Sequence, residues 1–298
     1  MEKDFISINQ GKNSWKRYIL SFFVMLAFLF IGSIVSVYLT EKHVVEDKDE
    51  STYFDNVTME AVNLDSIYSF VYLNMTYIVW IIGIFLAIRL IHKRSFKSLI
   101  TPYNGVNWKR IFWGFAVFFG LITFTTLIDF VLSPSDYRLN DINFKDYVTL
   151  FLFVLILTPI QTTTEEVFFR GYLMQWIGKI VKNHYILSIL AGLIFAALHF
   201  ANPEMEYSAV LIGADYVLSG ILWCFITART NSVELTIGAH AANNMFLGWF
   251  LTMDNTAFGN IPSLFVVGNI NPAITLMWTA FSLIIFTYLS IKKYGVSN

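Results

Sequence analysis

Long apolar stretches recur along this chain, and they constrain its fold more than any other feature. The hydrocarbon core of a bilayer is about 30 Å thick, so a helix that crosses it needs about 20 consecutive apolar residues. The stretches of this kind are Tyr18–Leu39, Ile67–Ile91, Ile111–Leu132, Tyr147–Ile177, Tyr185–Phe200, Tyr207–Ala228, Ser232–Thr252 and Pro272–Ile291. The sequence therefore predicts an all-α, polytopic membrane helix bundle with about eight transmembrane helices.

The composition excludes most other classes of protein. Hydrophobic residues make up 56% of the 298 residues and charged residues only 14%, whereas a soluble domain contains about 25% charged residues. The net charge of −1 provides no basic surface that would attract nucleic acid. We therefore expect a single membrane-embedded domain over residues 1–298, with the lipid bilayer as a partner and no nucleic acid.

The basic residues alternate between the two sides of the predicted bundle. Fifteen lysines and arginines lie in the segments that include both ends of the chain, and four lie in the alternate segments. Because cytoplasmic loops carry an excess of basic residues, we expect both the N and C termini to be cytoplasmic. The bias toward Ile, Lys, Asn and Phe suggests an AT-rich genome, so we expect an integral, multi-pass protein of a bacterial plasma membrane.

Ionisable side chains inside the fourth stretch need an explanation, because each costs about 2.5–3.5 kcal/mol on insertion scales. Glu166 and Arg170 are four residues apart and can pair on one face of a helix. Glu165 is offset by about 100° and points elsewhere. An ion pair thus accounts for one carboxylate, and the other is left unpaired. An unpaired buried carboxyl group is suited to act as a general acid or base.

Further polar side chains lie in the three stretches that follow. His199 closes the fifth, Asp215 lies in the sixth, and His240 and Asn244 are four residues apart in the seventh. With a rise of ~1.5 Å per residue, these histidines, the asparagine and Glu165 lie roughly 12 to 21 Å from the cytoplasmic face. We therefore expect a carboxylate, two imidazoles and a carboxamide to meet in one layer. Asp215 is either a partner of one histidine or a structural polar contact.

Three short motifs occur in order on separate stretches: Glu165-Glu166-x-x-x-Arg170, Phe195-x-x-x-His199 and His240-x-x-x-Asn244. In this order and at membrane depth, they resemble the CPBP family. These intramembrane endopeptidases comprise the CAAX proteases and bacteriocin-processing proteins and are also called the Abi family. The resemblance covers residues 147–252, which we take as the catalytic core. It implies an enzyme that hydrolyses peptide bonds of membrane-associated or prenylated, CAAX-type peptides.

The resemblance also implies a role for each motif residue. Glu165 activates a water molecule, and His199 helps to hold it. His240 and Asn244 stabilise the oxyanion that forms when the water attacks a peptide carbonyl. The residues expected to support this site are Glu166, Arg170 and Phe195 from the motifs, together with Asp215.

Other mechanisms and functions stay open on the sequence alone. The favoured interpretation requires no cofactor. The family has also been described as metalloproteases, and Glu165, His199 and His240 could hold zinc or another divalent metal. A non-catalytic membrane scaffold or regulator and a proton-coupled transporter are further alternatives. Bacterial relatives in the family are linked to bacteriocin self-immunity or to the maturation of peptide signals.

Overall fold

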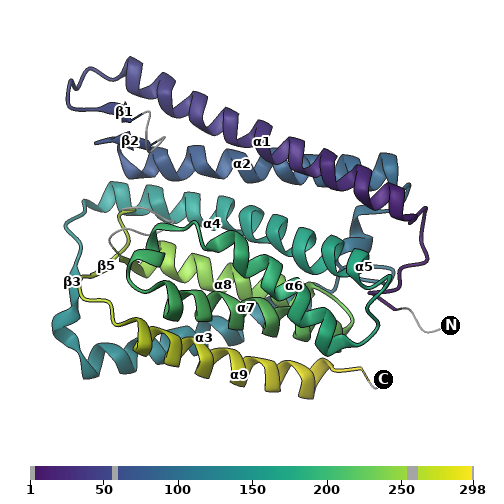
Figure 1. Ribbon diagram of the computed structural model, residues 1–298. Coiled ribbons are helices and arrows are strands. Elements are labelled where there is room, and N and C mark those ends of the chain that lie inside the picture. Colours follow the sequence, from purple (N-terminus) through teal and green to yellow (C-terminus); the bar gives the residue numbers. More distant parts are fainter. Residues whose placement is uncertain (1–3, 56–59, 254–260, 297–298) are drawn as a thin grey trace.

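The computed structural model describes residues 4–55, 60–253 and 261–296, and long helices dominate these residues (Figure 1). The helices form one bundle, in which α1 begins and α9 ends at the same end. The long helices are α1 (Trp15–Glu46), α2 (Ser66–Leu86), α3 (Trp108–Leu132), α4 (Phe144–Glu166), α6 (His184–His199), α7 (Ala209–Thr230), α8 (Glu234–Phe250) and α9 (Pro272–Tyr294).

Two of these helices continue into wider π-helical turns. α2 continues as η1 (Ala87–Ile91), and α4 continues as η4 (Val167–Leu173) before it returns to α-helix in α5 (Met174–Ile177). The 3₁₀ turns between helices are η2 (Phe96–Leu99), η3 (Pro134–Asp136) and η5 (Pro203–Glu206). Because π-helical turns are rare and often occur at functional sites, the end of α4 is a candidate position for such a site.

Each apolar stretch identified in the sequence is helical over most of its length, which confirms the predicted polytopic helix bundle. Among the described residues, six helical segments are long and apolar enough to cross a membrane. α6 and α8 are shorter, with 16 and 17 residues. α8 does not need to face lipid, because neighbouring helices bury it along most of its length.

Three-residue strands form two small sheets at the opposite end of the bundle from the start of α1 (Figure 1). β1 (Tyr53–Asp55) pairs antiparallel with β2 (Glu60–Val62). In the second sheet, β5 (Phe265–Val267) pairs antiparallel with β3 (Tyr137–Leu139) and parallel with β4 (Leu251–Met253). Because β4 follows α8 directly, the second sheet ties the end of α8 to the segments beside α3 and α9.

The arrangement of the helices separates a buried interior from an apolar outer surface. α8 contacts α3, α4 and α7, while α1 pairs with α2, which in turn packs on α4. Large apolar side chains of the outer helices face away from the bundle, including Ile34 of α1, Phe112 of α3 and Leu198 of α6. Lipid tails are as apolar as these side chains, so their exposure fits a protein surrounded by a bilayer.

Glycines allow α3 and α8 to approach each other closely. A Cβ atom on Gly238 of α8 would lie 2.0 Å from the backbone oxygen of Ile111, and a Cβ atom on Gly114 of α3 would lie 2.4 Å from the backbone oxygen of Leu235. No side chain fits in either position without displacing a helix. Small residues commonly allow such close packing in membrane bundles, and here they set the position of α8 against α3.

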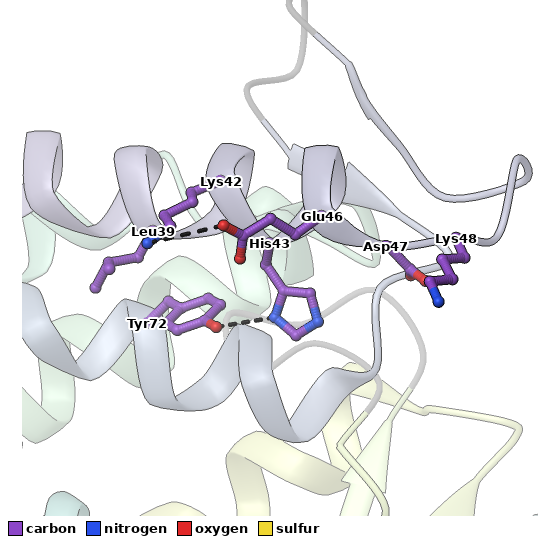
Figure 2. A pocket seen from close by; sticks show the side chains of 7 residues that line it. All are labelled: Leu39, Lys42, His43, Glu46, Asp47, Lys48 and Tyr72. Atoms are coloured by element: carbon purple, nitrogen blue, oxygen red, sulfur yellow. Dashed lines mark hydrogen bonds and ion pairs between the residues drawn. The ribbon is translucent and has the colours of Figure 1, made fainter.

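An open pocket lies between the end of α1 and the start of α2 (Figure 2). The hydroxyl of Tyr72 is hydrogen-bonded to Nδ1 of His43 at 2.8 Å inside it. The residues that line the pocket are Leu39, Lys42, His43, Glu46, Asp47, Lys48 and Tyr72. None of them belongs to the motifs identified in the sequence, so this pocket is not the predicted active site.

We expect the Gly238→Ala variant to be destabilised, because its methyl group would meet backbone atoms of α3. The matched variant Gly120→Ala changes a glycine of α3 whose Cβ atom would meet nothing within 4 Å. This variant should be neutral or slightly stabilised, since alanine favours a helix over glycine by about 1 kcal/mol. Thermal unfolding in detergent, followed by tryptophan fluorescence, measures both variants. Equal unfolding midpoints would contradict the close approach of α3 and α8.

Candidate active site

Glu166, the last residue of α4, forms the centre of a buried ion-pair network. Its side chain is completely buried, and its Oε1 atom lies 3.0 Å from Nη1 of Arg170 and 3.0 Å from Nδ1 of His240. The pairing of Glu166 with Arg170 is the one expected from their spacing along the helix. The contact with His240 adds a partner from α8. One carboxylate therefore connects α4, the π-helical segment η4 and α8.

Arg170 lies in η4, in which every residue is buried. Its guanidinium carbon lies 4.1 Å from the ring centroid of Phe195 on α6 and 5.3 Å from that of Trp223 on α7. Aromatic faces carry partial negative charge and attract a cation, most strongly where water is excluded. The rings of α6 and α7 therefore help to hold the guanidinium beside Glu166.

His240 lies between the two adjacent glutamates. Nδ1 is hydrogen-bonded to Glu166, and Nε2 lies 4.0 Å from Oε2 of Glu165. The ring packs against Trp223, with the two ring centroids 4.7 Å apart. A separation of 4.0 Å is too long for a hydrogen bond, so Nε2 and the Glu165 carboxylate face each other without forming one. Each can therefore form a hydrogen bond to a third group.

Glu165 is buried, but it is not isolated as its offset from Arg170 had suggested. Tyr77, which extends from α2, lies within interaction range of both Glu165 and Gln161. Gln161 precedes Glu165 by one helical turn on α4, so both lie on the face that meets α2. The hydroxyl of Tyr77 can donate to the carboxylate while it accepts from the Gln161 amide. Glu165 therefore faces a residue from a helix far away in the sequence.

His199 lies at the end of α6, and its ring contacts two aromatic rings. Nδ1 donates to the carbonyl oxygen of Phe195 at 2.8 Å. The ring centroid lies 4.3 Å from that of Phe195 and 4.5 Å from that of Tyr216 on α7. With its proton on Nδ1, the neutral ring carries a lone pair on Nε2. Glu165 and His240 lie within electrostatic range of this ring.

The other two polar candidates are placed differently from each other. Asn244 follows His240 by one turn on the same face of α8, is buried, and accepts a hydrogen bond of 3.0 Å from Nδ2 of Asn243. Its own amide nitrogen is left as a donor beside the histidine. Asp215, in contrast, lies within interaction range of Thr279 of α9. This neighbour places Asp215 where α7 packs on α9.

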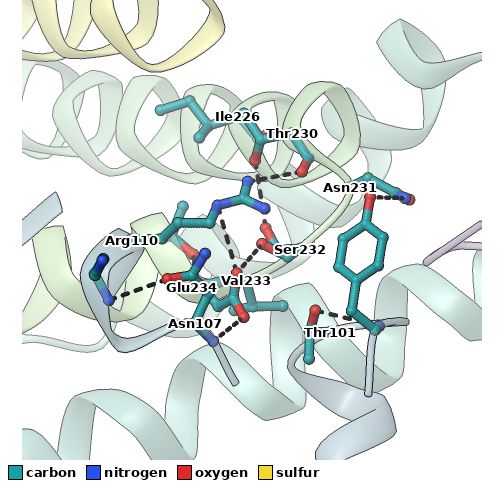
Figure 3. Close-up of polar contacts among 12 residues, drawn as sticks. Thr101, Asn107, Arg110, Ile226, Thr230, Asn231, Ser232, Val233 and Glu234 are labelled. Carbon is teal, nitrogen blue, oxygen red and sulfur yellow. Dashed lines mark hydrogen bonds and ion pairs between the residues drawn. The ribbon is translucent and has the colours of Figure 1, made fainter. Parts of the chain in front are cut away.

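A second buried ion pair fixes the start of α8 (Figure 3). The Glu234 carboxylate lies 3.4 Å from Nε of Arg110 and accepts hydrogen bonds from the backbone nitrogen of Asn107 and the hydroxyl of Ser232. Nη2 of Arg110 also donates to the carbonyl oxygen of Thr230. These contacts tie the first residue of α8 to α3, and so they set the position along the bundle at which His240 and Asn244 lie.

The sequence left a metal site open as an alternative. Among the described residues, no three His, Cys, Asp or Glu side chains come together in a group that could hold a metal ion. Zinc sites have at least three protein ligands. Glu165, His199 and His240, which the sequence suggested as ligands, are not such a group in this arrangement, and a metal site formed by them stays a prediction.

Several residues of the site were not found from the sequence. Tyr77, Tyr216 and Trp223 contact Glu165, His199 and His240 respectively, yet each is one aromatic residue among many in an apolar stretch. The sequence could have identified Gln161, because an amide one turn before a buried glutamate lies on the same helix face.

Comparisons with known proteins agree with the motifs. The family model described as type II CAAX prenyl endopeptidase Rce1-like matches residues 145–246. The uncharacterized protein YyaK of Bacillus subtilis (strain 168) is 40% identical over 277 residues, which cover 93% of this chain and 90% of YyaK. No solved structure matches the chain. The range matched by the family model includes every site residue predicted from the sequence, whereas Tyr77 lies outside it.

We expect Glu166→Gln and Arg170→Met each to lower the free energy of unfolding by about 3–5 kcal/mol, because each leaves a buried charge without its partner. The double variant should lose much less than the sum of the two. Denaturant titration in detergent measures these losses.

The exposed pair of Lys42 and Glu46 provides the control for this cycle. It has the same spacing, and its side chains are 53% and 67% exposed. Glu46→Gln should therefore change the free energy of unfolding by less than about 0.5 kcal/mol. Losses at Glu166 and Arg170 that are equally small, or that add in the double variant, would show that the buried pair does not stabilise the fold.

Proposed function

The chain belongs to the Rce1-like family of type II CAAX prenyl endopeptidases, and we propose that it cleaves membrane-associated or prenylated peptides with a water molecule activated by Glu165. It is an integral, multi-pass membrane protein and a peptidase of the CAAX type. The observation that supports the proposed mechanism best is the position of His240 between two carboxylates, one bound at 3.0 Å and the other facing it at 4.0 Å.

Glu165 is the proposed general base because the adjacent carboxylate, that of Glu166, is already bound to two other side chains. Glu166 is neutralised by Arg170 and bound to His240, so it has little capacity to accept a proton from water. Glu165 lies beside Tyr77 and faces Nε2 of His240. Its carboxylate takes a proton from the water whose oxygen attacks the peptide carbonyl carbon. The same proton then passes to the departing amine nitrogen as the C–N bond breaks.

His199 is proposed to hold the attacking water together with Glu165. Because Nδ1 donates to the carbonyl of Phe195, the lone pair on Nε2 can accept a hydrogen bond from the water. Two acceptors then fix the two hydrogens of the water, which directs its oxygen lone pair toward the substrate carbonyl. Such positioning removes much of the entropic cost of the attack.

His240 and Asn244 are proposed to stabilise the oxyanion. To donate from Nε2 while Nδ1 donates to Glu166, the His240 ring must carry a proton on each nitrogen. The resulting positive charge is balanced, because Glu165 and Glu166 supply two negative charges and Arg170 supplies one positive charge. Donors in a site that excludes water stabilise a developing oxyanion strongly.

The apolar outer surface suggests how a substrate arrives. A peptide tethered by a lipid or a hydrophobic segment is already concentrated in the bilayer, and the cleaved bond must reach a site inside the helix bundle. We propose a membrane-associated or prenylated peptide as substrate and bacteriocin self-immunity or peptide-signal maturation as the process. We further propose that the reaction requires no metal ion.

We expect Glu165→Gln to reduce cleavage of a quenched prenylated peptide, or of a membrane peptide library, to background. The amide keeps the shape of the side chain but cannot accept the proton. The unfolding midpoint should stay close to that of the wild-type protein, and Glu46→Gln, at an exposed carboxylate, should keep full activity.

The same assay separates the alternatives. A strong chelator should leave wild-type cleavage unchanged. Loss of activity with the chelator and recovery with zinc would instead establish a metal-dependent reaction. A folded wild-type protein that cleaves none of the peptides would favour the scaffold or transporter interpretation.

We expect Asn244→Leu to lower kcat by about 10²- to 10³-fold with little change in KM, as is typical of losing one oxyanion donor. Asn74→Leu is a matched control, because Asn74 is an equally buried asparagine of α2 whose amide donates to Phe70 of its own helix. A loss that appears in KM and not in kcat would argue that Asn244 binds the substrate in its ground state.

A further inference from the structure

The ring of His199 is held from one side by a group of residues that belongs to none of the three sequence motifs. The hydroxyl of Tyr216 donates to Oε1 of Glu204 and accepts a hydrogen bond of 3.0 Å from Nδ2 of Asn202. Asn202 Nδ2 also lies 3.0 Å from the same Glu204 oxygen. Asn202, Glu204 and Tyr216 thus form a closed polar triangle, which we call the loop clamp.

The loop clamp is joined to His199 in two independent ways. The Tyr216 ring stacks on the imidazole, with an interplanar angle of 30° and a centroid separation of 4.5 Å. In addition, the backbone nitrogen of Asn202 donates to the carbonyl oxygen of His199 at 3.0 Å. The chain therefore turns back on itself immediately after His199, and the clamp fixes both the backbone and the ring of this residue.

The need for such a device follows from the position of His199. The residue ends α6, and helix ends fray because their last carbonyl groups have no partners in the helix. Phe195 provides one aromatic contact to the ring, and Tyr216 provides the other. Without the contact from Tyr216, the imidazole could rotate about its side-chain bonds, and Nε2 would lose its direction.

We propose that Tyr216 is a positioning residue for His199, and that Glu204 and Asn202 act through it by fixing its hydroxyl. The proposal rests on the proposed function, in which Nε2 of His199 holds the attacking water. It assigns a role to the connection between α6 and α7, which carries η5. The loop clamp sets the direction of the His199 ring, which holds the water, and the clamp does not touch the substrate. It therefore acts on the rate of the chemical step.

The kinetic test compares two tyrosine-to-phenylalanine variants. Tyr216→Phe keeps the stacked ring and removes the hydroxyl, and we expect kcat to fall about five- to tenfold, the effect of one net hydrogen bond. KM should stay unchanged, and the unfolding midpoint should fall by no more than the loss of one hydrogen bond predicts. Tyr72→Phe is the matched control, since it also removes a tyrosine hydroxyl that is bound to another side chain, that of His43 in the open pocket (Figure 2). It should leave kcat unchanged.

Conservative variants at Glu204 distinguish positioning from a general effect of charge. Glu204→Gln keeps an oxygen that can accept from Tyr216, so it should keep most of the wild-type kcat. Glu204→Leu removes the acceptor and should match Tyr216→Phe. Equal losses in Glu204→Gln and Glu204→Leu would overturn the proposed hydrogen-bonding role.

A measurement that needs no activity tests the same proposal. The ring nitrogens of the five histidines can be labelled with ¹⁵N, and the His199 signals can be assigned by comparison with His199→Gln. We expect these signals to broaden or shift in Tyr216→Phe and to stay unchanged in Tyr72→Phe.

The two readouts separate the possible failures. If wild-type protein cleaves no peptide but the His199 signals respond to Tyr216→Phe, the proposed function fails and the clamp stands. If wild-type protein is active and both kcat and the His199 signals are unchanged in Tyr216→Phe, the clamp does not position His199. If the unfolding midpoint of Tyr216→Phe falls so far that unfolded protein explains the loss of kcat, the role of Tyr216 is structural.

Discussion

The completely buried carboxylate of Glu166 is the group on which the rest of the site depends. It pairs with Arg170 and with His240 at the same distance of 3.0 Å, and so it joins the end of α4 to η4 and to α8. An isolated charge at this depth would be costly, whereas a paired and hydrogen-bonded one is tolerated. Because breaking such a pair leaves an uncompensated charge, the three segments cannot move apart independently.

Around this pair, aromatic rings take the place of further charges. Phe195 and Trp223 face the Arg170 guanidinium, and Phe195 and Tyr216 enclose the imidazole of His199. Such walls exclude water while offering the electron-rich faces that favour a cation. In these surroundings electrostatic interactions are stronger than in water, which suits the proposed activation of a water molecule inside a membrane protein.

The positions of the helices follow from equally local contacts. Gly238 and Gly114 bring α8 against α3, and the Glu234–Arg110 pair fixes where α8 begins. Together they decide which turn of α8 faces the end of α4. The shortness of α8 follows from the same arrangement, because a helix enclosed by others and continued by β4 does not have to span the bilayer by itself.

The sequence by itself determined the helices, the buried Glu166–Arg170 pair and the order of the motifs, because all three depend on apolar length and on spacing along one helix. It also led to the right family. The tertiary structure alone decided that Glu165 meets Tyr77, that Tyr216 stacks on His199, and that Asp215 contacts α9. These contacts join residues from different helices, and an aromatic residue in an apolar stretch looks the same in the sequence whether it faces lipid or a buried carboxylate.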